Sequence, residues 1–290
     1  MKKPGQKPAW VKVKAPDQEV LKNMEGLTEK WGVHTICESA VCPNVGRCFA
    51  QGTATFLILG DVCTRGCRFC AVARGGLLPP DPGEPARVAA AVQELSLDYA
   101  VITSVTRDDL DDGGAAHYGA TVRAIKEVNP DTEVEVLIPD FGGSYADCAK
   151  VAAASPSVYG HNLETVPRLY PLVRRGADYK RSLSVLHYFK RQVPGAVTKT
   201  SLILGLGETE EEVIAVMEDL REVDCDILAL GQYLQPSPEQ YPVQRYLSPE
   251  EFDFLQKKAE KMGFAAVASG TFVRSSYEAS KIFHNIQAKR

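Results

Sequence analysis

Three cysteines in the run DVCTRGCRFC are spaced so that they could ligate one iron–sulfur cluster. Cys63, Cys67 and Cys70 follow the pattern Cys-x3-Cys-x2-Cys. Three thiolates hold three irons of a cubane [4Fe–4S] cluster and leave the fourth iron without a protein ligand. An iron with an open position binds a small molecule, so the cluster can do chemistry as well as carry electrons. The spacing therefore predicts a reactive cluster on this short segment.

A second triplet lies just upstream, in CESAVCPNVGRC. Cys37, Cys42 and Cys48 follow the pattern Cys-x4-Cys-x5-Cys. Two independent sets of three thiolates within the first quarter of the chain indicate two clusters.

Zinc is the main alternative for the downstream set, because Cys67 and Cys70 alone would suit a zinc knuckle. Structural zinc takes four ligands, and neither triplet has a nearby fourth cysteine or a well-spaced histidine. His34, three residues before Cys37, is the only histidine near either set. Disulfides are disfavoured because the N-terminus lacks the hydrophobic region of a secretory signal. We therefore favour clusters over both alternatives.

Composition excludes several classes of protein. The 290 residues are 44% hydrophobic, enough for one large core or two modest ones. The net charge of −4 gives no sign of the basic surface that binds nucleic acid. No apolar run is long enough to cross a bilayer. Clusters need free thiolates, so we expect a reducing cytoplasm, with no nucleic-acid or membrane partner. Cys148 and Cys225 stand apart from the triplets and read as buried small hydrophobes.

Apolar, β-branched runs alternate with amphipathic stretches along the rest of the chain. The predicted strands are residues 53–60, 99–105, 133–140, 157–164, 199–207 and 226–234. The predicted helices, whose apolar residues recur at spacings of three and four, are residues 86–95, 116–128, 144–154, 182–192 and 208–222. In the last of these, Thr209 is the expected N-cap.

This alternation indicates an α/β fold with a parallel sheet covered by helices. Six strand–helix units predict a partial (β/α)6 barrel of the TIM-like kind, and an open doubly wound sheet is the alternative. We expect three parts: an N-terminal extension with the upstream cysteines (1–52), the partial barrel (53–240) and a short C-terminal extension (241–290).

Polar motifs follow the predicted strands, where parallel α/β folds place their active sites. The downstream cysteines follow the first strand, and the later motifs are TSVTRDDLDDGG (103–114), PDFGG (139–143), HNLET (161–165), GLGE (205–208) and QYLQPS (232–237). The acidic run at 107–112 reads as a functional loop, with a solvated loop or a metal site as alternatives. Asn162 and Glu164 alternate along an extended segment, so both point to one side. They would suit recognition of a ribose or an ammonium group, or simply a hydrogen-bonded strand end.

The C-terminal run GTFVRSSYEA (270–279) places two serines beside an arginine. Such a run usually forms a loop or a helix cap. Because the upstream cysteine triplet lacks a fourth ligand, a serine oxygen from this run could supply it.

Taken together, these motifs resemble those of the lipoyl synthase family within the radical SAM superfamily. The resemblance extends from about Lys7 to Ala279 and rests on KPAWVKV, CESAVCPNVGRC, GDVCTRGCRFCAV, TSVTRDDLDDGGA, VEVLIPDFGG, HNLETVPRLYPLVRRGADYKRSL, LGLGETEEEV, LGQYLQPS and VRSSYEA. Two positions depart from the family pattern, which usually has proline at Thr271 and histidine at Gln240.

The resemblance implies an enzyme that replaces C–H bonds at C6 and C8 of a protein-bound octanoyl-lysine with C–S bonds. S-adenosylmethionine (SAM) and two [4Fe–4S] clusters would be its cofactors. Cys63, Cys67 and Cys70 would hold the cluster that cleaves SAM to a 5′-deoxyadenosyl radical. A sacrificial auxiliary cluster would supply the sulfur, held by Cys37, Cys42, Cys48 and Ser276, with Ser275 the alternative ligand.

The resemblance also suggests SAM contacts and partners. Asn162 and Glu164 would hold SAM, with help from Thr103, Ser104 and Arg175. Arg274 would position the carrier lysine segment or neutralise a carboxylate. The partners would be octanoylated lipoyl carrier domains or glycine-cleavage H protein, a low-potential electron donor and an iron–sulfur carrier for cluster repair. The carriers are generally acidic, so basic residues near the active-site rim are candidate docking groups. Other readings are a biotin-synthase-like enzyme and an iron–sulfur electron carrier.

Overall fold

The computed structural model describes residues 7–12, 18–36, 44, 48 and 53–289. Two of the upstream cysteines, Cys37 and Cys42, therefore lie outside the described residues. The downstream cysteines Cys63, Cys67 and Cys70, every predicted strand and helix, and the C-terminal serines lie within them.

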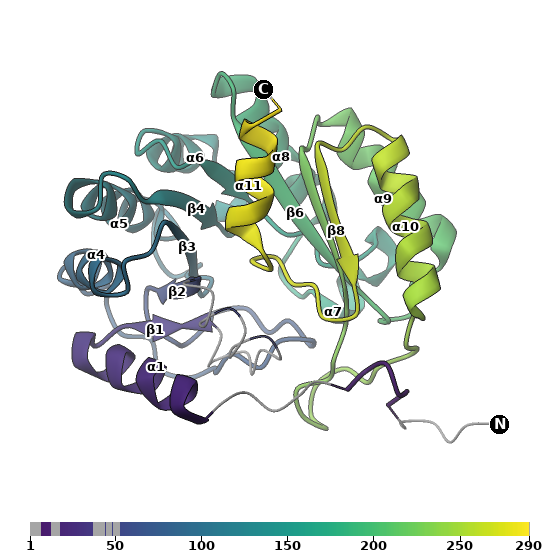
Figure 1. Cartoon of the computed structure of the whole chain (residues 1–290), viewed down its shortest axis with the longest axis horizontal. Coiled ribbons are helices and arrows are strands. Elements are labelled where there is room, and N and C mark those ends of the chain that lie inside the picture. The colour runs from purple at the N-terminus through teal and green to yellow at the C-terminus, as the bar shows by residue number, and fades with distance from the viewer. Residues whose placement is uncertain (1–6, 13–17, 37–43, 45–47, 49–52, 290) are drawn as a thin grey trace.

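The described strands form one curved sheet in which each strand lies beside the one before it (Figure 1). β1 pairs antiparallel with β2, and all later neighbours pair parallel. The strands are β1 (His34–Thr35), β2 (Ala54–Ile58), β3 (Tyr99–Ser104), β4 (Glu133–Leu137), β5 (Val158–Gly160), β6 (Val197–Leu204), β7 (Ile227–Gln232) and β8 (Ala266–Gly270). In a barrel the strands lie in the order in which they occur along the chain. In a doubly wound sheet, by contrast, the order of the strands reverses at a switch point.

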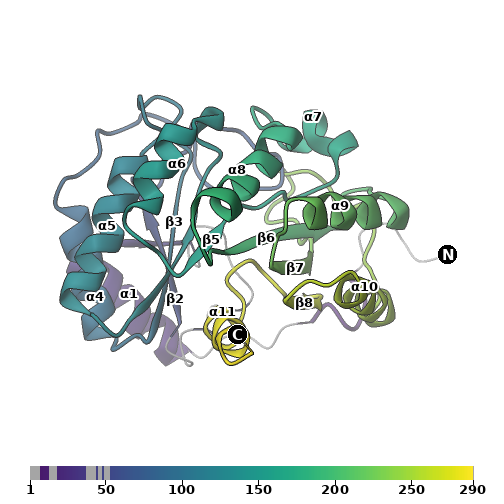
Figure 2. The ribbon, with the colours of Figure 1, turned by 90° about the horizontal axis from the view of Figure 1, so that it is seen from above.

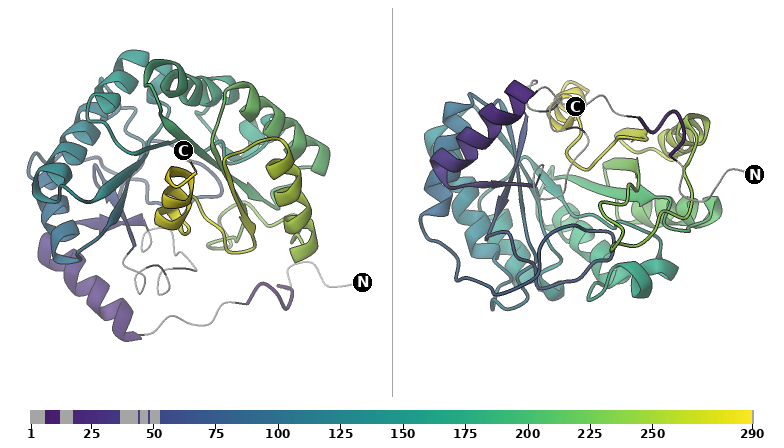
Figure 3. Two further views of the ribbon diagram at one scale, coloured as in Figure 1. Left: turned by 45° about the horizontal axis from the view of Figure 1, so that its top comes forward. Right: turned by 90° about the horizontal axis from the view of Figure 1, so that it is seen from below.

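Helices cover the convex side of this sheet (Figure 3, left). The described helices are α1 (Gln18–Trp31), α4 (Glu84–Glu94), α5 (Ala115–Val128), α6 (Tyr145–Ala152), α7 (Tyr170–Val173), α8 (Tyr179–Gln192), α9 (Glu210–Glu222), α10 (Pro249–Lys261) and α11 (Ala279–Gln287), with short 3-10 turns at Phe141–Gly143 and Pro167–Leu169. Within the described residues β1 and β8 do not pair, so the barrel stays open. The predicted α/β partial barrel is confirmed.

Local sequence explains where the elements begin. The whole of β2 is buried, as its apolar run predicts. Thr209 caps α9 as expected, and its side chain forms a capping box with Glu212. Ser248 and Glu251 form the same box at the start of α10, where Pro249 occupies the first turn. These caps fix the points at which the chain turns from the sheet into the outer helices.

The C-terminal part of the chain continues the sheet. β8 pairs in parallel with β7, so the barrel has one more parallel strand than the six that the sequence predicts. The missed segment, AVASG, has small side chains that are only half-buried, so it lacks the strong apolar signal of the other strands. After β8 the chain enters α11.

Helix α11 lies on the concave side of the sheet, between the β2 side and the β8 side (Figures 2 and 3). Phe283 packs against Tyr99 with ring centroids 5.8 Å apart. The cluster around this pair includes the first residues of four strands: Tyr99, Val158, Val197 and Ile227. Helix α11 therefore covers the amino ends of the strands and leaves the carboxyl ends free for a site.

Candidate active site

The loop that carries Cys63, Cys67 and Cys70 follows β2 and is closed on itself. We call residues 62–73 the cysteine loop. The backbone N–H of Cys63 donates to the carbonyl of Ala73 at 3.0 Å, and a parallel bridge joins the two ends of the loop. Inside the loop, the N–H of Cys70 donates to the carbonyl of Cys67 at 3.1 Å. All three cysteines are free and half-buried, on the one loop where the sequence placed them.

Backbone amides point at two of these sulfurs. The N–H of Thr106 donates to Cys63 Sγ at 3.4 Å, and the N–H of Val72 donates to Cys70 Sγ at 3.5 Å. Burial raises the pKa of the Cys67 thiol to about 12 and that of Cys70 to about 11. Partly buried thiols with raised pKa values keep their protons at neutral pH unless a metal displaces them.

The donor set fits a cubane cluster. In the described chain, no three His, Cys, Asp or Glu side chains surround a single point as the ligands of one metal ion would. A cubane instead presents a separate iron to each thiolate, and hydrogen bonds to sulfur tune its potential. Three free thiols on one loop, two of them accepting amide hydrogen bonds, meet these requirements.

An ionic network anchors the cysteine loop to the ends of β3 and β4. Arg65 Nη2 lies 2.8 Å from Asp108 Oδ1 and 2.7 Å from Asp140 Oδ1. Arg181 Nε reaches the other oxygen of Asp140 at 2.8 Å. Burial alone would raise the pKa of Asp140, but the hydrogen bonds and charge of Arg65 hold it well below its usual range. Asp140 is fully buried, so it must accept both guanidiniums to remain charged.

The opposite side of the loop is held by segments that follow later strands. The N–H of Arg68 donates to Val173 O at 2.8 Å, and the N–H of Tyr241 donates to Arg68 O at 2.7 Å. Gln240, which stands where the family usually has histidine, directs its amide nitrogen at Cys70 O from 3.5 Å. The loop is therefore fixed on both flanks before any cofactor binds.

Asn162 and Glu164 lie together just beyond β5, as the sequence predicts. Asn162 Nδ2 donates to Glu164 Oε1 at 3.0 Å. Glu164 has a φ of 66°, an unusual conformation for a residue other than glycine. Burial raises the pKa of the Glu164 carboxyl, and the charge of Arg174 opposes that shift. Strained, desolvated polar residues at strand ends are typical of binding sites.

The C-terminal serine motif reaches this pair. Ser275 Oγ donates to Asn162 Oδ1 at 2.9 Å. The approach depends on Gly231 in β7, because a Cβ there would lie 2.0 Å from the carbonyl oxygen of Val273. Of the two candidate serine ligands, Ser275 thus has a protein partner, and Ser276 is the next residue along.

The same C-terminal segment contacts the region of the upstream cysteines. Asn44 Nδ2 donates to the carbonyl of Phe272 at 2.6 Å. The N–H of Cys48 donates to Asn44 O at 2.9 Å. Of the upstream cysteines, Cys48 is therefore joined through Asn44 to the C-terminal segment that holds the serines.

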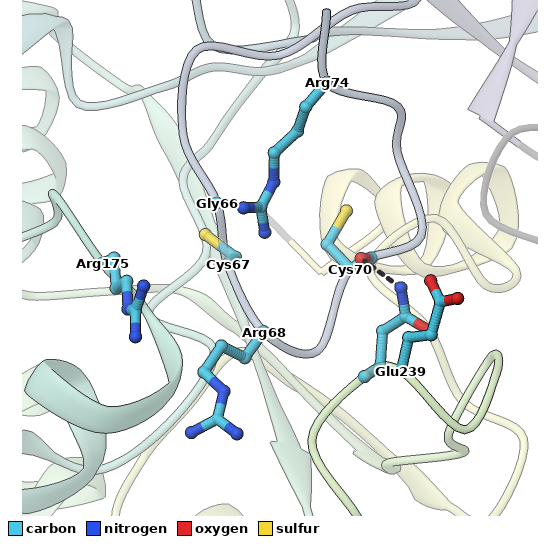
Figure 4. A pocket seen from close by; sticks show the side chains of 8 residues that line it. Gly66, Cys67, Arg68, Cys70, Arg74, Arg175 and Glu239 are labelled. Carbon is cyan, nitrogen blue, oxygen red and sulfur yellow. Dashed lines mark hydrogen bonds between the residues drawn. The ribbon is translucent and has the colours of Figure 1, made fainter.

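The remaining candidate SAM residues have different surroundings. Thr103 Oγ1 donates to Leu137 O at 3.0 Å and is engaged within the sheet. Ser104 Oγ is buried and makes no regular hydrogen bond to any described residue. Arg175 is exposed and lines the pocket beside the cysteine loop, together with Cys67 (Figure 4). Its neighbour Arg174, which the sequence analysis did not select, is the buried arginine of this region.

Several residues of the acidic run at 107–112 make hydrogen bonds and ion pairs that hold local structure. Arg107 is buried and donates to the carbonyls of Leu59 and Leu78 at 3.1 and 2.9 Å, and it pairs with Asp109 at 2.8 Å. Asp112 accepts hydrogen bonds from two backbone amides at the start of α5. The run therefore ties the carboxyl end of β3 to its surroundings, and it is more than a solvated loop.

Comparison with known proteins agrees with this geometry. Residues 57–220 match the family model described as the radical SAM superfamily. A lipoyl synthase of Geobacter sulfurreducens is 57% identical over 274 residues, 94% of this chain and 90% of the relative. A lipoyl synthase of Methylococcus capsulatus is 51% identical over 279 residues, 96% of this chain and 87% of the relative.

Solved structures show the same fold at low sequence identity. Methylornithine synthase (PylB) aligns with a TM-score of 0.56 and 14% identity, covering 81% of each chain. HydG, a maturase of the [FeFe]-hydrogenase, aligns with a TM-score of 0.56 and 12% identity over 94% of this chain and 75% of the other. These structures therefore share the fold of the chain.

Proposed function

The chain belongs to the lipoyl synthase family of the radical SAM superfamily, and on this basis we propose a role for each residue of the site. The enzyme is a sulfurtransferase of lipoate synthesis, with SAM and [4Fe–4S] clusters as cofactors. The substrate we propose is an octanoyl chain in amide linkage to a carrier lysine, which receives sulfur at C6 and C8. The observation that carries this proposal is identity of 57% over 94% of the chain.

The cofactors are needed because carbons C6 and C8 carry no acidic hydrogen. When bound, the cluster and SAM supply hydrogen-atom abstraction, which no acid or base side chain can perform on such carbons. Cys63, Cys67 and Cys70 hold the cluster, and the amide of Thr106 donates to its first thiolate. This assignment is supported by the closed cysteine loop and its amide donors to sulfur.

Residues after β5 hold SAM in this proposal. Asn162 and Glu164 bind its polar groups, and Ser104 contributes a buried hydroxyl. Thr103 supports the end of β3, and Arg175 lies at the outer side of the pocket. The strained, half-buried Glu164 and its hydrogen bond to Asn162 support these roles.

A second set of ligands holds the sacrificial cluster. We assign Cys37, Cys42, Cys48 and Ser276 to it. The hydrogen bond from Ser275 to Asn162 supports Ser276 over Ser275, because the hydroxyl of Ser275 is already engaged. A serine oxygen is a harder ligand than a thiolate, so it would release its iron more readily as sulfur is consumed.

The proposed partners follow from the same chemistry. Octanoylated lipoyl carrier domains or glycine-cleavage H protein present the substrate, a low-potential donor supplies electrons, and an iron–sulfur carrier rebuilds the spent cluster. We propose a cytoplasmic location. Among the described helices, none has both the length and the apolar character needed to cross a membrane.

A single-turnover experiment tests the proposal. Anaerobically reconstituted protein receives SAM, a low-potential reductant and an octanoyl-lysyl peptide, and the products are identified by mass spectrometry. We expect a dithiolated peptide together with 5′-deoxyadenosine. Deoxyadenosine without sulfur in the peptide would retain the radical SAM assignment but exclude lipoyl formation.

A further inference from the structure

The chain turns sharply where it leaves β2 for the cysteine loop. β2 ends at Ile58, and the next two residues, Leu59 and Gly60, have positive φ values of 68° and 85°. Glycine adopts this conformation freely, whereas leucine adopts it only at a cost in free energy. A strained residue persists where the surrounding structure fixes it, and such residues gather at functional sites. We call Leu59 and Gly60 the Leu59 turn.

Two buried side chains of opposite charge hold both backbone polar groups of Leu59. The N–H of Leu59 donates to Glu84 Oε2 at 2.8 Å. The carbonyl of Leu59 accepts from Arg107 Nη1 at 3.1 Å. All three residues are at most 5% exposed. Hydrogen bonds to charged groups are stronger than those between neutral groups, so these two oppose the strain at Leu59.

Neighbouring residues support the turn and the carboxylate that holds it. His117 Nε2 lies 2.7 Å from the same oxygen of Glu84. The Leu59 side chain occupies the space beside Gly114, where a Cβ would overlap Leu59 Cδ1. Glu84 is the first residue of α4, and Gly114 directly precedes α5. The Leu59 turn is therefore held by residues at the starts of two outer helices.

Arg107 also fixes the far end of the segment that carries the downstream cysteines. Its Nη2 donates to the carbonyl of Leu78 at 2.9 Å. One guanidinium thus joins Leu59, before the cysteine loop, to Leu78, after it. The carboxylate of Asp109 pairs with the same Nη2 at 2.8 Å and holds the guanidinium in place. Both ends of the segment that contains the cysteine loop therefore meet at Arg107.

We propose that Glu84 and Arg107 are positioning residues, which hold the strained Leu59 turn and thereby set the cysteine loop where its cluster receives SAM. This inference rests on the proposed function in taking the cysteine loop as the site of the SAM-cleaving cluster. A loop that is already held in one arrangement does not have to be ordered when a ligand binds. If only a fraction of the molecules has the competent arrangement, the affinity falls by that fraction. Loss of the hold should therefore weaken SAM binding by folded holoprotein.

Two conservative variants of Glu84 separate reach from charge. Glu84→Gln removes the charge but keeps an oxygen that can accept the Leu59 N–H. Glu84→Asp keeps the charge at the start of α4 but is shorter by one methylene. Because the proposed role depends on reach, Glu84→Asp should raise the SAM Kd about ten-fold and Glu84→Gln less than about three-fold. A carboxylate that only stabilised the N-terminus of α4 would give the reverse order.

The SAM Kd is measured by equilibrium dialysis on anaerobically reconstituted full-length protein, without reductant. Hydrogen exchange of the peptide that spans residues 59–73 is followed in the same samples. In Glu84→Asp this peptide should exchange about ten-fold faster than in the wild type, since the turn is no longer held. Arg107→Lys tests the other hydrogen bond independently. It keeps the charge but loses the fork that spans both carbonyls, so it should raise the SAM Kd about five-fold.

Glu250 provides a matched control. It also lies in the first turn of an outer helix, α10, and it is exposed. Glu250→Asp and Glu250→Gln should leave both the SAM Kd and the exchange of residues 59–73 unchanged.

Three results would overturn the inference. Wild-type SAM affinity in both Glu84→Asp and Arg107→Lys would show that the cysteine loop needs no such hold. Weaker binding in Glu84→Gln than in Glu84→Asp would assign Glu84 to the helix terminus. A raised SAM Kd with unchanged exchange would show that Glu84 does not act through the loop. Failure of the proposed function is seen separately, because the wild-type protein would then form no lipoyl product in the single-turnover assay.

Discussion

Two adjacent serines have different surroundings at the residue scale. Ser275 donates to Asn162, which in turn donates to Glu164, so its hydroxyl is part of the site after β5. Ser276 is the next residue, and we assign it to the auxiliary cluster. Two consecutive residues of the serine motif would then contact the SAM site and the auxiliary cluster.

The variant Ser276→Cys tests the ligand and its lability. A thiolate binds iron more firmly than an alkoxide, so the variant should assemble both clusters but insert sulfur at least about ten-fold more slowly. Iron content and single-turnover product report the two effects independently. Ser275→Ala is the control, because it removes a neighbouring hydroxyl and should leave iron content unchanged. Normal turnover by Ser276→Cys would refute the lability argument.

Asp140 holds the cysteine loop through its pairs with Arg65 and Arg181. Asp140→Asn should cost about 3 kcal/mol in the free energy of unfolding, because it removes the buried carboxylate that Arg65 and Arg181 share and leaves Arg65 only the half-exposed Asp108. We also expect less iron per chain after reconstitution, since Arg65 lies within the loop itself. Both quantities are measured on the purified protein.

A surface ion pair supplies the comparison for this prediction. Asp81→Asn removes the partner of Arg87, and the Asp81 side chain is 56% exposed. Exposed pairs of this kind contribute little to stability, so stability and iron content should barely change. If Asp140→Asn behaved like Asp81→Asn, the anchoring role of Asp140 would be wrong.

At the element scale, α11 closes one end of the partial barrel. Phe283 is 3% exposed and packs on Tyr99 at the amino end of β3. Phe283→Ala should lower the free energy of unfolding by about 3 kcal/mol. Chemical denaturation checks this expectation.

Phe254 on α10 is a matched control, since its side chain is 46% exposed. Phe254→Ala should change stability by less than about 0.5 kcal/mol. Equal effects of the two alanine variants would contradict the covering role of α11.

The sequence predicts elements where side-chain character is strong and fails where it is weak. The apolar runs identify β2, β3, β4, β6 and β7, whereas the small residues of β8 do not mark it as a strand. β5 is shorter than predicted, because its regular ladder ends at Gly160 and Glu164, with its positive φ, pairs with β6 only through an isolated bridge to Leu202.

The same reasoning applies to the site. The cysteine spacing and the Asn162–Glu164 pair are local patterns, so sequence alone reveals them. The contact between Arg65 and Asp140 joins residues 75 positions apart, and only tertiary packing brings them together. Likewise, Arg174 is buried and Arg175 lines the pocket because of the way the chain turns after α7 ends at Val173.

At the scale of the whole molecule, buried titratable groups make stability depend on pH. His161 is 2% exposed, and Nδ1 lies 2.8 Å from the carbonyl oxygen of Ile138. Burial lowers the pKa of His161 to about 4, from an ordinary value of about 6.5. Between these values the unfolded chain binds a proton that the folded protein does not. The contribution of His161 is therefore fully present above pH ~6.5 and is lost as the pH falls toward ~4.

The cluster-free protein should accordingly lose stability between pH 7 and pH 5, and His161→Gln should lose less. Asp140, whose pKa is also held low, adds to the acid sensitivity only below its ordinary pKa of about 3.9, so the two groups act in separate ranges. Denaturant unfolding at pH 7, 6 and 5 measures the difference. His284→Gln is the control, because His284 is exposed on α11. Parallel pH profiles for wild type and His161→Gln would show that His161 is protonated in the folded protein, and that burial does not set its charge.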